Sequence, residues 1–126
     1  AEQAAVLADL LGCFRPRRII SSPATRCVQT VEWYADAIGA DIEISKALTV
    51  PDQVHGDPRQ LVLDVIEDGV PAVLCGHGET LPGLVAWLYA YLDAAPPADP
   101  WLAKGEFDVL HLLDGELVGA ERHLAD

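Results

Sequence analysis

Arg17 to Tyr34 reads RRIISSPATRCVQTVEWY and combines a short strand, a polar turn and an amphipathic helix. The β-branched pair Ile19-Ile20 predicts the strand, and Ser21-Ser22 ends it. Pro23 suits the first turn of a helix, because that position needs no amide proton. We therefore expect a strand that leads through a polar turn into a helix over residues 24–38, ended by a glycine. Its inward face is expected to consist of Val28, Val31, Ala35 and Ile38.

Arg26 falls in the first turn of this predicted helix. The amino end of a helix favours anions, so an arginine there is best explained by an anion held between its guanidinium and the free amides. This reasoning predicts a phosphate site. The alternative, at about even odds, is a solvated arginine or one paired with an acid such as Glu32 or Glu79.

The composition is that of one folded domain spanning residues 1–126, with 51% hydrophobic residues. The formal net charge is −12, and only eight residues are Lys or Arg. Nucleic acids and anionic membranes need a basic face, so we expect neither as a partner. A small phosphorylated ligand remains compatible with one or two local arginines. The longest apolar stretch, Leu81 to Leu92, is interrupted by proline and glycine and is too short to cross a bilayer.

Three cysteines, Cys13, Cys27 and Cys75, lie in apolar stretches of the sequence. An odd number without zinc-ligand spacing predicts buried, reduced thiols, and neither a disulfide framework nor a metal site. We expect a cytoplasmic protein on this basis.

The other elements follow from local patterns. Glycine and proline mark most of their ends, and Asp114-Gly115 is the strongest hairpin signal in the chain. In chain order we expect a helix over Ala1–Leu11 ended by Gly12, a strand over Asp41–Ser45 with Ile42 and Ile44 inward, a loop over Lys46–Asp57, a helix capped by Asp57 and ended near Gly69, a strand over Ala72–Cys75, a helix through Leu92, and a hairpin of Glu106–Leu113 and Glu116–Leu124.

This alternation predicts a three-layer α/β fold with a mainly parallel sheet, flanking helices and a C-terminal antiparallel hairpin. Ligands of such sheets bind outside the carboxyl ends of the strands. The Ser21-Ser22-Pro23 turn and the Gly76-His77-Gly78 turn both follow strands. If the two strands are near neighbours, Arg26 and His77 converge on one crevice.

His77 lies between two glycines at the start of a predicted helix. Glycines let the backbone turn tightly and approach a ligand, and an imidazole there can hydrogen-bond a phosphoryl oxygen. The alternative, at about one in three, is a histidine that caps the helix or bonds a carbonyl. His55 sits in a loop that can cover the crevice, whereas His111 and His123 fall on the hairpin, where ordinary structural roles are expected.

The run Ser21-Ser22-Pro23-Ala24-Thr25-Arg26, followed by Gln29-Thr30, and the later pair His77-Gly78 resemble the histidine phosphatase, or phosphoglycerate mutase-like, superfamily. The order of helices and strands also matches over nearly the whole chain. Within the superfamily the chain is most similar to the phosphatase-like domain that follows a Nudix domain in MutT-type nucleotide hydrolases. The resemblance to that subgroup rests on the short length and on Lys104-Gly105 ahead of the hairpin.

The resemblance implies that Arg26 clamps phosphate, with Ser22 and Gly78 beside it, and that His77 is a second, non-nucleophilic histidine that stabilises the transferring phosphoryl group. It implies no metal and no cofactor. The family nucleophile is a histidine in an R-H-G motif at the end of a strand ahead of the first helix here. The sequence has no such motif, and the loop holding Asp52, His55 and Asp57 offers no recognisable proton donor.

We therefore expect an N-terminally truncated domain with little phosphatase turnover alone, and either instability or a homodimer through an exposed sheet edge. The first hypothesis is a phosphate-ester or anhydride hydrolase domain in a Nudix-linked nucleotide hydrolase. The second is a regulatory or dimerisation module of phosphatase fold that binds nucleotide or docks on a Nudix domain. An R-H-G motif before Ala1 would favour the first. A third hypothesis, a flavodoxin-like binding domain, requires Arg26 and His77 to lie far apart.

Overall fold

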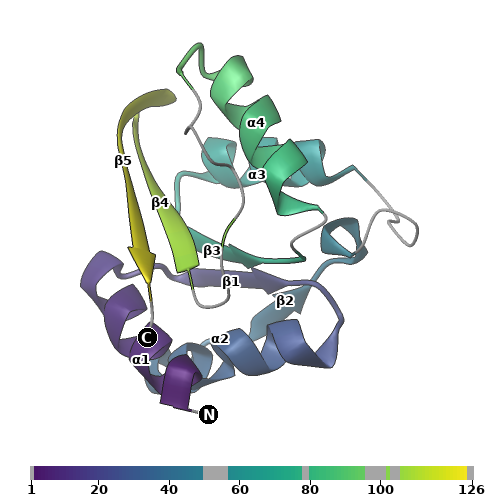
Figure 1. The fold of residues 1–126 in the computed structure, drawn as a ribbon, viewed down its shortest axis with the longest axis vertical. Coiled ribbons are helices and arrows are strands. Elements are labelled where there is room, and N and C mark those ends of the chain that lie inside the picture. The colour runs from purple at the N-terminus through teal and green to yellow at the C-terminus, as the bar shows by residue number, and fades with distance from the viewer. Residues whose placement is uncertain (1, 50–56, 78–79, 96–101, 103–105, 125–126) are drawn as a thin grey trace.

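A computed structural model describes residues 2–49, 57–77, 80–95, 102 and 106–124 (Figure 1). Its centre is a parallel sheet of three strands: β1 (Arg18–Ser21), β2 (Ile42–Ile44) and β3 (Ala72–Cys75), in the order β2-β1-β3. Ser21 is level with Ile44 on one side and with Cys75 on the other. The carboxyl ends of all three strands therefore meet at one edge of the sheet.

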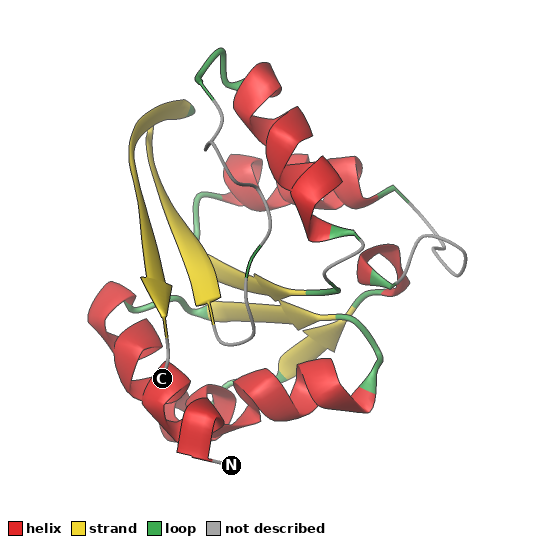
Figure 2. Cartoon of the chain, in the orientation of Figure 1, coloured by secondary structure: helices red, strands yellow, loops and turns green. Residues whose placement is uncertain are grey.

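Helices cover both faces of this sheet (Figures 1 and 2). α1 (Glu2–Phe14) and α2 (Thr25–Ile38) lie on one face, and α3 (Pro58–Asp68) and α4 (Leu81–Tyr91) lie on the other. A short 3₁₀ helix, η1 (Lys46–Leu48), follows β2. The predicted three-layer α/β class is confirmed.

Two neighbouring isoleucines show how β1 builds both layers. Successive side chains of a strand point to opposite faces. Ile19 is fully buried in the core with α1 and α2, and Ile20 is buried in the core with η1, α3 and α4. The buried residues beside Ile19 are Leu7, Leu11, Val31, Tyr34 and Ala35; those beside Ile20 are Leu48, Val62 and Leu84.

The predicted hairpin is also confirmed, with the boundaries expected from the sequence. β4 (Glu106–Leu113) and β5 (Glu116–Leu124) form a separate antiparallel sheet with an irregularity between His111 and Leu112. Asp114 and Gly115 have φ of 52° and 80°, as a tight hairpin turn with left-handed residues requires. Among the described strands, β3 is hydrogen-bonded to β1 alone, so its other edge has no strand beside it.

The predicted ends of α2 and α3 are confirmed. Gly39 and Gly69 follow these helices with φ of 69° and 74°, and their amides bond carbonyls of the last turn. Asp57 caps α3 by accepting a hydrogen bond from the Arg59 amide. These ends depend on local chemistry alone, which explains why the sequence shows them.

Four expectations about burial and helix length are wrong. α1 does not end at Gly12 but continues to Phe14, and Arg15 takes the left-handed conformation, with φ of 54°. Ile38 and Ile44 are exposed although both were expected inward, because the last turn of α2 and the outer strand β2 have no described layer over those side chains. Cys13 is exposed, since it lies on the solvent side of α1.

Candidate functional site

The two polar turns predicted to meet do meet. Ser22 follows β1, His77 follows β3, and the Ser22 Oγ lies 2.9 Å from the His77 Nε2. The Ser22 amide donates to the Cys75 carbonyl over 2.9 Å, which continues the β1–β3 pairing by one residue. We call Ser22, Cys27, Cys75 and His77 the Ser22–His77 cluster.

The backbone holds His77 in place at the start of α4. Its carbonyl accepts hydrogen bonds from the amides of Thr80 and Leu81, at 3.0 and 2.9 Å. A Cβ added at Gly76 would lie 3.2 Å from the Leu48 carbonyl oxygen, so the close approach of the chain to η1 favours glycine. Thr80 ties the turn to the same region by donating from its hydroxyl to the Thr49 carbonyl at 2.6 Å.

Ser22 has no solvent exposure, and its hydroxyl connects three elements. The oxygen accepts a hydrogen bond from the Ala24 amide at 3.2 Å, and it also bonds to His77. Ser22 also contributes, after Cys75, to lowering the pKa of the Cys27 thiol. Because a hydroxyl can both donate and accept, the Ser22–His77 bond is compatible with either ring tautomer of His77.

Cys27, in the first turn of α2, extends this hydrogen-bonded group towards β3. Its sulfur lies 3.6 Å from the Gly76 carbonyl oxygen and 3.9 Å from His77 Nε2. The Cys75 thiol hydrogen-bonds to the Cys27 sulfur and thereby lowers the pKa of Cys27 to about 5, helped by Ser22 and by the charges of His77 and Arg26 and opposed by burial. The same bond, together with burial, raises the pKa of Cys75. The two thiols thus differ in acidity, and Cys27 is the more acidic of the pair.

Arg26 precedes Cys27 in α2, and its side chain is exposed. Within the described residues no carboxylate is within ion-pair distance of its guanidinium, so the predicted pair with Glu32 does not form. The first turn of α2 has no acidic residue, and no side chain caps its amino end. A cation and free amides therefore face the solvent together, as the phosphate-site hypothesis requires.

The other predicted residues fall in different places. Gly78, Glu79, Asp52 and His55 lie outside the described residues. Asp57 is the cap of α3, which leaves its carboxylate on the surface beside Arg59. His111 and His123 both hydrogen-bond Glu121 on the hairpin, at 2.6 and 2.8 Å, and hold the ordinary structural roles expected of them.

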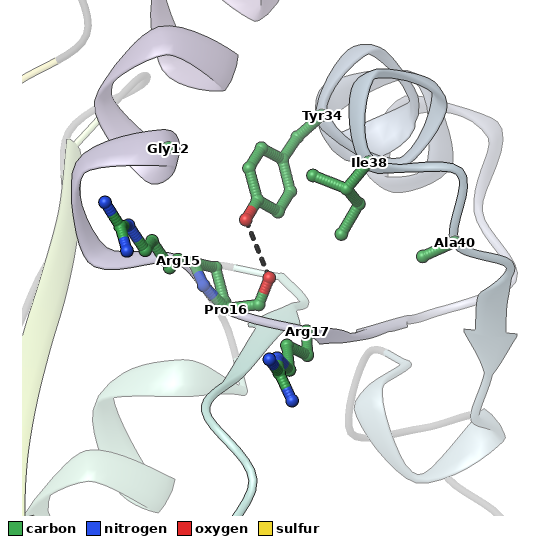
Figure 3. Close-up of a pocket in the computed structure, with 7 residues that line it drawn as sticks. All are labelled: Gly12, Arg15, Pro16, Arg17, Tyr34, Ile38 and Ala40. Atoms are coloured by element: carbon green, nitrogen blue, oxygen red, sulfur yellow. Dashed lines mark hydrogen bonds between the residues drawn. The ribbon is translucent and has the colours of Figure 1, made fainter.

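A hollow of about 400 Å³ lies at the opposite end of β1 (Figure 3). The Tyr34 hydroxyl donates to the Pro16 carbonyl at 2.7 Å at its centre, while the guanidinium groups of Arg15 and Arg17 point away from one another. We call this the amino-end hollow; it is lined by Gly12, Arg15, Pro16, Arg17, Tyr34, Ile38 and Ala40. Because the two cations do not converge, the hollow does not resemble an anion site.

Two searches of the described residues bear on the class of site. No group of three or more His, Cys, Asp or Glu side chains there is arranged to hold a metal ion. The helices of the same part of the chain are all too short or too polar to cross a membrane.

The two cysteines of the cluster were missed as members of the site by sequence reasoning, which placed them in the core as inert thiols. The available signal was their position: Cys27 follows Arg26 directly, and Cys75 precedes the Gly76-His77 turn. The prediction that all three thiols are free is confirmed.

Comparisons with known proteins agree with this fold and with the sequence motif. Residues 1–49 match the family model of the histidine phosphatase superfamily (branch 1). An 8-oxo-(d)GTP phosphatase of Mycolicibacterium smegmatis is 31% identical over 121 residues, which is 94% of this chain but 37% of that protein. The chain thus spans little more than a third of that relative.

Two mycobacterial structures share the fold. One is glucosyl-3-phosphoglycerate phosphatase in complex with VO3, with a TM-score of 0.59, 18% identity, and coverage of 70% of this chain and 65% of that one. The other is described as mycobacterial hydrolase 1, with a TM-score of 0.57, 19% identity and the same coverage. Residues 1–49 thus match the histidine phosphatase superfamily, and these two solved structures share the fold of this chain.

Proposed function

We propose that this chain supplies the phosphate-contacting part of a hydrolase acting on phosphate esters or anhydrides of nucleotides. The observation that carries the proposal is the 2.9 Å contact between Ser22 Oγ and His77 Nε2, beside an exposed Arg26 without a carboxylate partner among the described residues. A fixed imidazole donor and a free guanidinium are the groups that stabilise negative charge on a transferring phosphoryl group.

In this proposal Arg26 clamps the phosphoryl oxygens, and Ser22 holds His77 so that the imidazole can donate to the same group. Gly78, which the family resemblance implies as a further phosphate contact, lies outside the described residues. The nucleophilic histidine comes from a strand outside the given sequence that pairs with the free edge of β3. This chain by itself then has little turnover.

The nucleotide substrate is supported by the 8-oxo-(d)GTP phosphatase that resembles 94% of this chain. We propose purine nucleoside triphosphates, oxidised ones included, as the substrate class, and a Nudix domain in the same polypeptide as the partner. The free thiols support a cytoplasmic location.

One observation favours a second candidate, a non-catalytic module that binds nucleotide, docks on a Nudix domain or forms a homodimer. Of the described histidines, His77 alone belongs to the Ser22–His77 cluster, and His111 and His123 are held by Glu121. Without a histidine nucleophile, an imidazole and an arginine bind phosphate but transfer nothing. If the edge of β3 pairs with a second copy, light scattering after size exclusion will show a dimer.

Phosphate release decides between the two candidates. This chain and a longer polypeptide that includes the preceding segment are compared on an aryl phosphate, nucleoside di- and triphosphates and dinucleoside polyphosphates. We expect turnover only in the longer form, lowered by about 10²-fold or more in Arg26→Ala and in His77→Ala. Arg17→Ala, which removes an arginine remote from the cluster, is the matched control and should retain activity. Phosphate binding without turnover in both forms would favour the module.

A further inference from the structure

The Ser22–His77 cluster holds two thiols that the proposed phosphate chemistry does not use. Cys27 comes from the first turn of α2 and Cys75 is the last residue of β3, so a bond between them would join a helix to the sheet. Both are free, Cys75 packs against the core that α2 helps to form, and the Cys27 sulfur lies 3.6 Å from the carbonyl oxygen of Gly76, the residue after Cys75. Cys27 is 6% exposed, and Cys75 is partly buried.

The surroundings of Cys27 favour thiolate chemistry. His77 Nε2 lies 3.9 Å from its sulfur, Arg26 is its neighbour in the chain, and α2 begins two residues earlier. Cationic groups and a helix amino end are the environment in which a cysteine becomes nucleophilic. Cys13 differs on each point. It is exposed in the last turn of α1, and its thiol bonds the Asp9 carbonyl at 3.7 Å.

We propose that Cys27 and Cys75 are a redox-active pair that a hydroperoxide converts to a reversible disulfide beside His77. This is a modification site additional to the proposed phosphatase function and does not depend on it. Cys75 packs against the core that α2 helps to form, and the Cys27 sulfur lies 3.6 Å from the carbonyl oxygen of Gly76, the residue after Cys75. The two thiols thus lie on the same side of the end of β3, where a disulfide would hold their sulfurs about 2.05 Å apart.

The reaction balances with the hydroperoxide as the only co-reactant. The Cys27 thiolate attacks one peroxide oxygen, the O–O bond breaks, and Cys27 becomes a sulfenic acid while hydroxide, or alkoxide from an organic peroxide, leaves. The Cys75 sulfur then attacks the Cys27 sulfur and displaces hydroxide, and the Cys75 proton completes a water molecule. The two sulfurs together lose two electrons, and the peroxide accepts them. A dithiol reductant reverses the change.

Disulfide formation alters the charge that His77 and Arg26 experience. In the reduced form the Cys27 sulfur lies 3.9 Å from His77 Nε2 and follows Arg26 in the chain, so a thiolate formed there would compete with an incoming anion for both groups. In the disulfide that negative charge is gone, and the sulfur turns towards Cys75. We therefore expect oxidation to strengthen phosphate binding severalfold. This second step rests on the proposed function, whereas disulfide formation itself does not.

The test uses Cys13→Ser, which removes the exposed thiol and prevents links between molecules. After treatment with hydrogen peroxide, we expect the intact mass to fall by two hydrogen atoms, a peptide linking Cys27 to Cys75, and recovery of both thiols with dithiothreitol. Two titratable thiols after prolonged treatment, or a mass gain from added oxygen without any linked peptide, would overturn the proposal. This measurement needs no further variant, so a folding failure elsewhere cannot leave it undecided.

Two variants in the same background sharpen the result. Cys75→Ser removes the resolving thiol, and we expect Cys27 sulfenic acid to accumulate and to be trapped by dimedone. Cys27→Ser should leave Cys75 reduced under the same treatment.

Titration with inorganic phosphate, followed by ³¹P NMR before and after oxidation, checks the second step, in which the disulfide strengthens phosphate binding. An unchanged affinity in fully disulfide-bonded protein would reject that step, and absence of phosphate binding in both forms would count against the proposed function instead.

Discussion

The two ends of β1 differ in what their polar groups bond to. At the carboxyl end, Ser22, Cys27, Cys75 and His77 bond to one another across β1, β3 and α2. At the amino end, Tyr34 donates to the Pro16 carbonyl, and the amides of Arg17 and Arg18 donate to the Pro71 carbonyl. At the carboxyl end, side chains from three elements therefore meet one another, whereas at the amino end the polar groups bond backbone carbonyls, apart from the ion pairs of Arg18.

This difference shows that the number of arginines does not locate the site. The amino end has three of them, yet Arg18 is bound by Glu43 and Asp68, and Arg15 and Arg17 point apart. At the carboxyl end, Arg26 lies in the uncapped first turn of α2, next in the chain to Cys27, whose sulfur is 3.9 Å from His77 Nε2. Convergence of unlike groups, rather than charge alone, distinguishes a site for chemistry from a structural junction.

The largest expected effect on stability concerns Ser22. Ser22→Ala removes a fully buried hydroxyl and leaves the Ala24 amide and His77 without their partner. We expect the free energy of unfolding to fall by about 1–3 kcal/mol, because buried polar groups are left unsatisfied. Urea denaturation measures the change. Thr30→Ala, which deletes an exposed hydroxyl, should stay within about 0.5 kcal/mol of the parent; a similar loss there would remove the distinction.

Tyr34→Phe applies the same test to the amino end. Tyr34 is 4% exposed, and its hydroxyl bonds the Pro16 carbonyl at 2.7 Å. The loss of this bond should cost about 1 kcal/mol, while phosphate binding should stay unchanged. Tyr91→Phe is the control, since Tyr91 is 58% exposed and a hydroxyl in contact with water contributes little. If Tyr34→Phe weakened phosphate binding, the two ends would not be functionally separate.

The smallest effect belongs to the ion pair between Arg18 and Glu43, at 2.8 and 3.0 Å. Arg18 lowers the pKa of the Glu43 carboxyl, so the pair stabilises the fold above the ordinary carboxyl pKa, and this contribution is lost as the pH falls through the lowered value. Because both side chains are partly exposed, Glu43→Gln should cost only about 0.2–1 kcal/mol at neutral pH.

Urea denaturation of Glu43→Gln at neutral pH and again below the carboxyl range checks this sign. The difference from the parent should shrink at the lower pH, where Glu43 itself is protonated. Glu116→Gln, at the exposed turn of the hairpin, should show no such convergence. A deficit in Glu43→Gln that grew in acid would show that the pair is not its source.

Local chemistry explains which elements the sequence could predict. The ends of α2 and α3 follow from Gly39, Gly69 and Asp57, and the hairpin follows from Asp114-Gly115. Each of these signals acts within a few residues of itself. The wrong predictions concern features that depend on packing against other elements. α1 continues beyond Gly12 to Phe14, and Ile44 is exposed because no described element covers it.

The sequence by itself determined the alternation of strands and helices, the two polar turns and the position of Arg26 in the first turn of α2. Only the tertiary structure decided that Ser22 bonds His77 and that Cys27 meets Cys75. Those contacts join residues far apart in the chain, and they depend on the register that sets Ser21 level with Cys75 in the parallel sheet. Hydrophobic periodicity specifies which face of a strand is buried but not which strand end lies beside another, so the meeting of these side chains follows only from the assembled sheet.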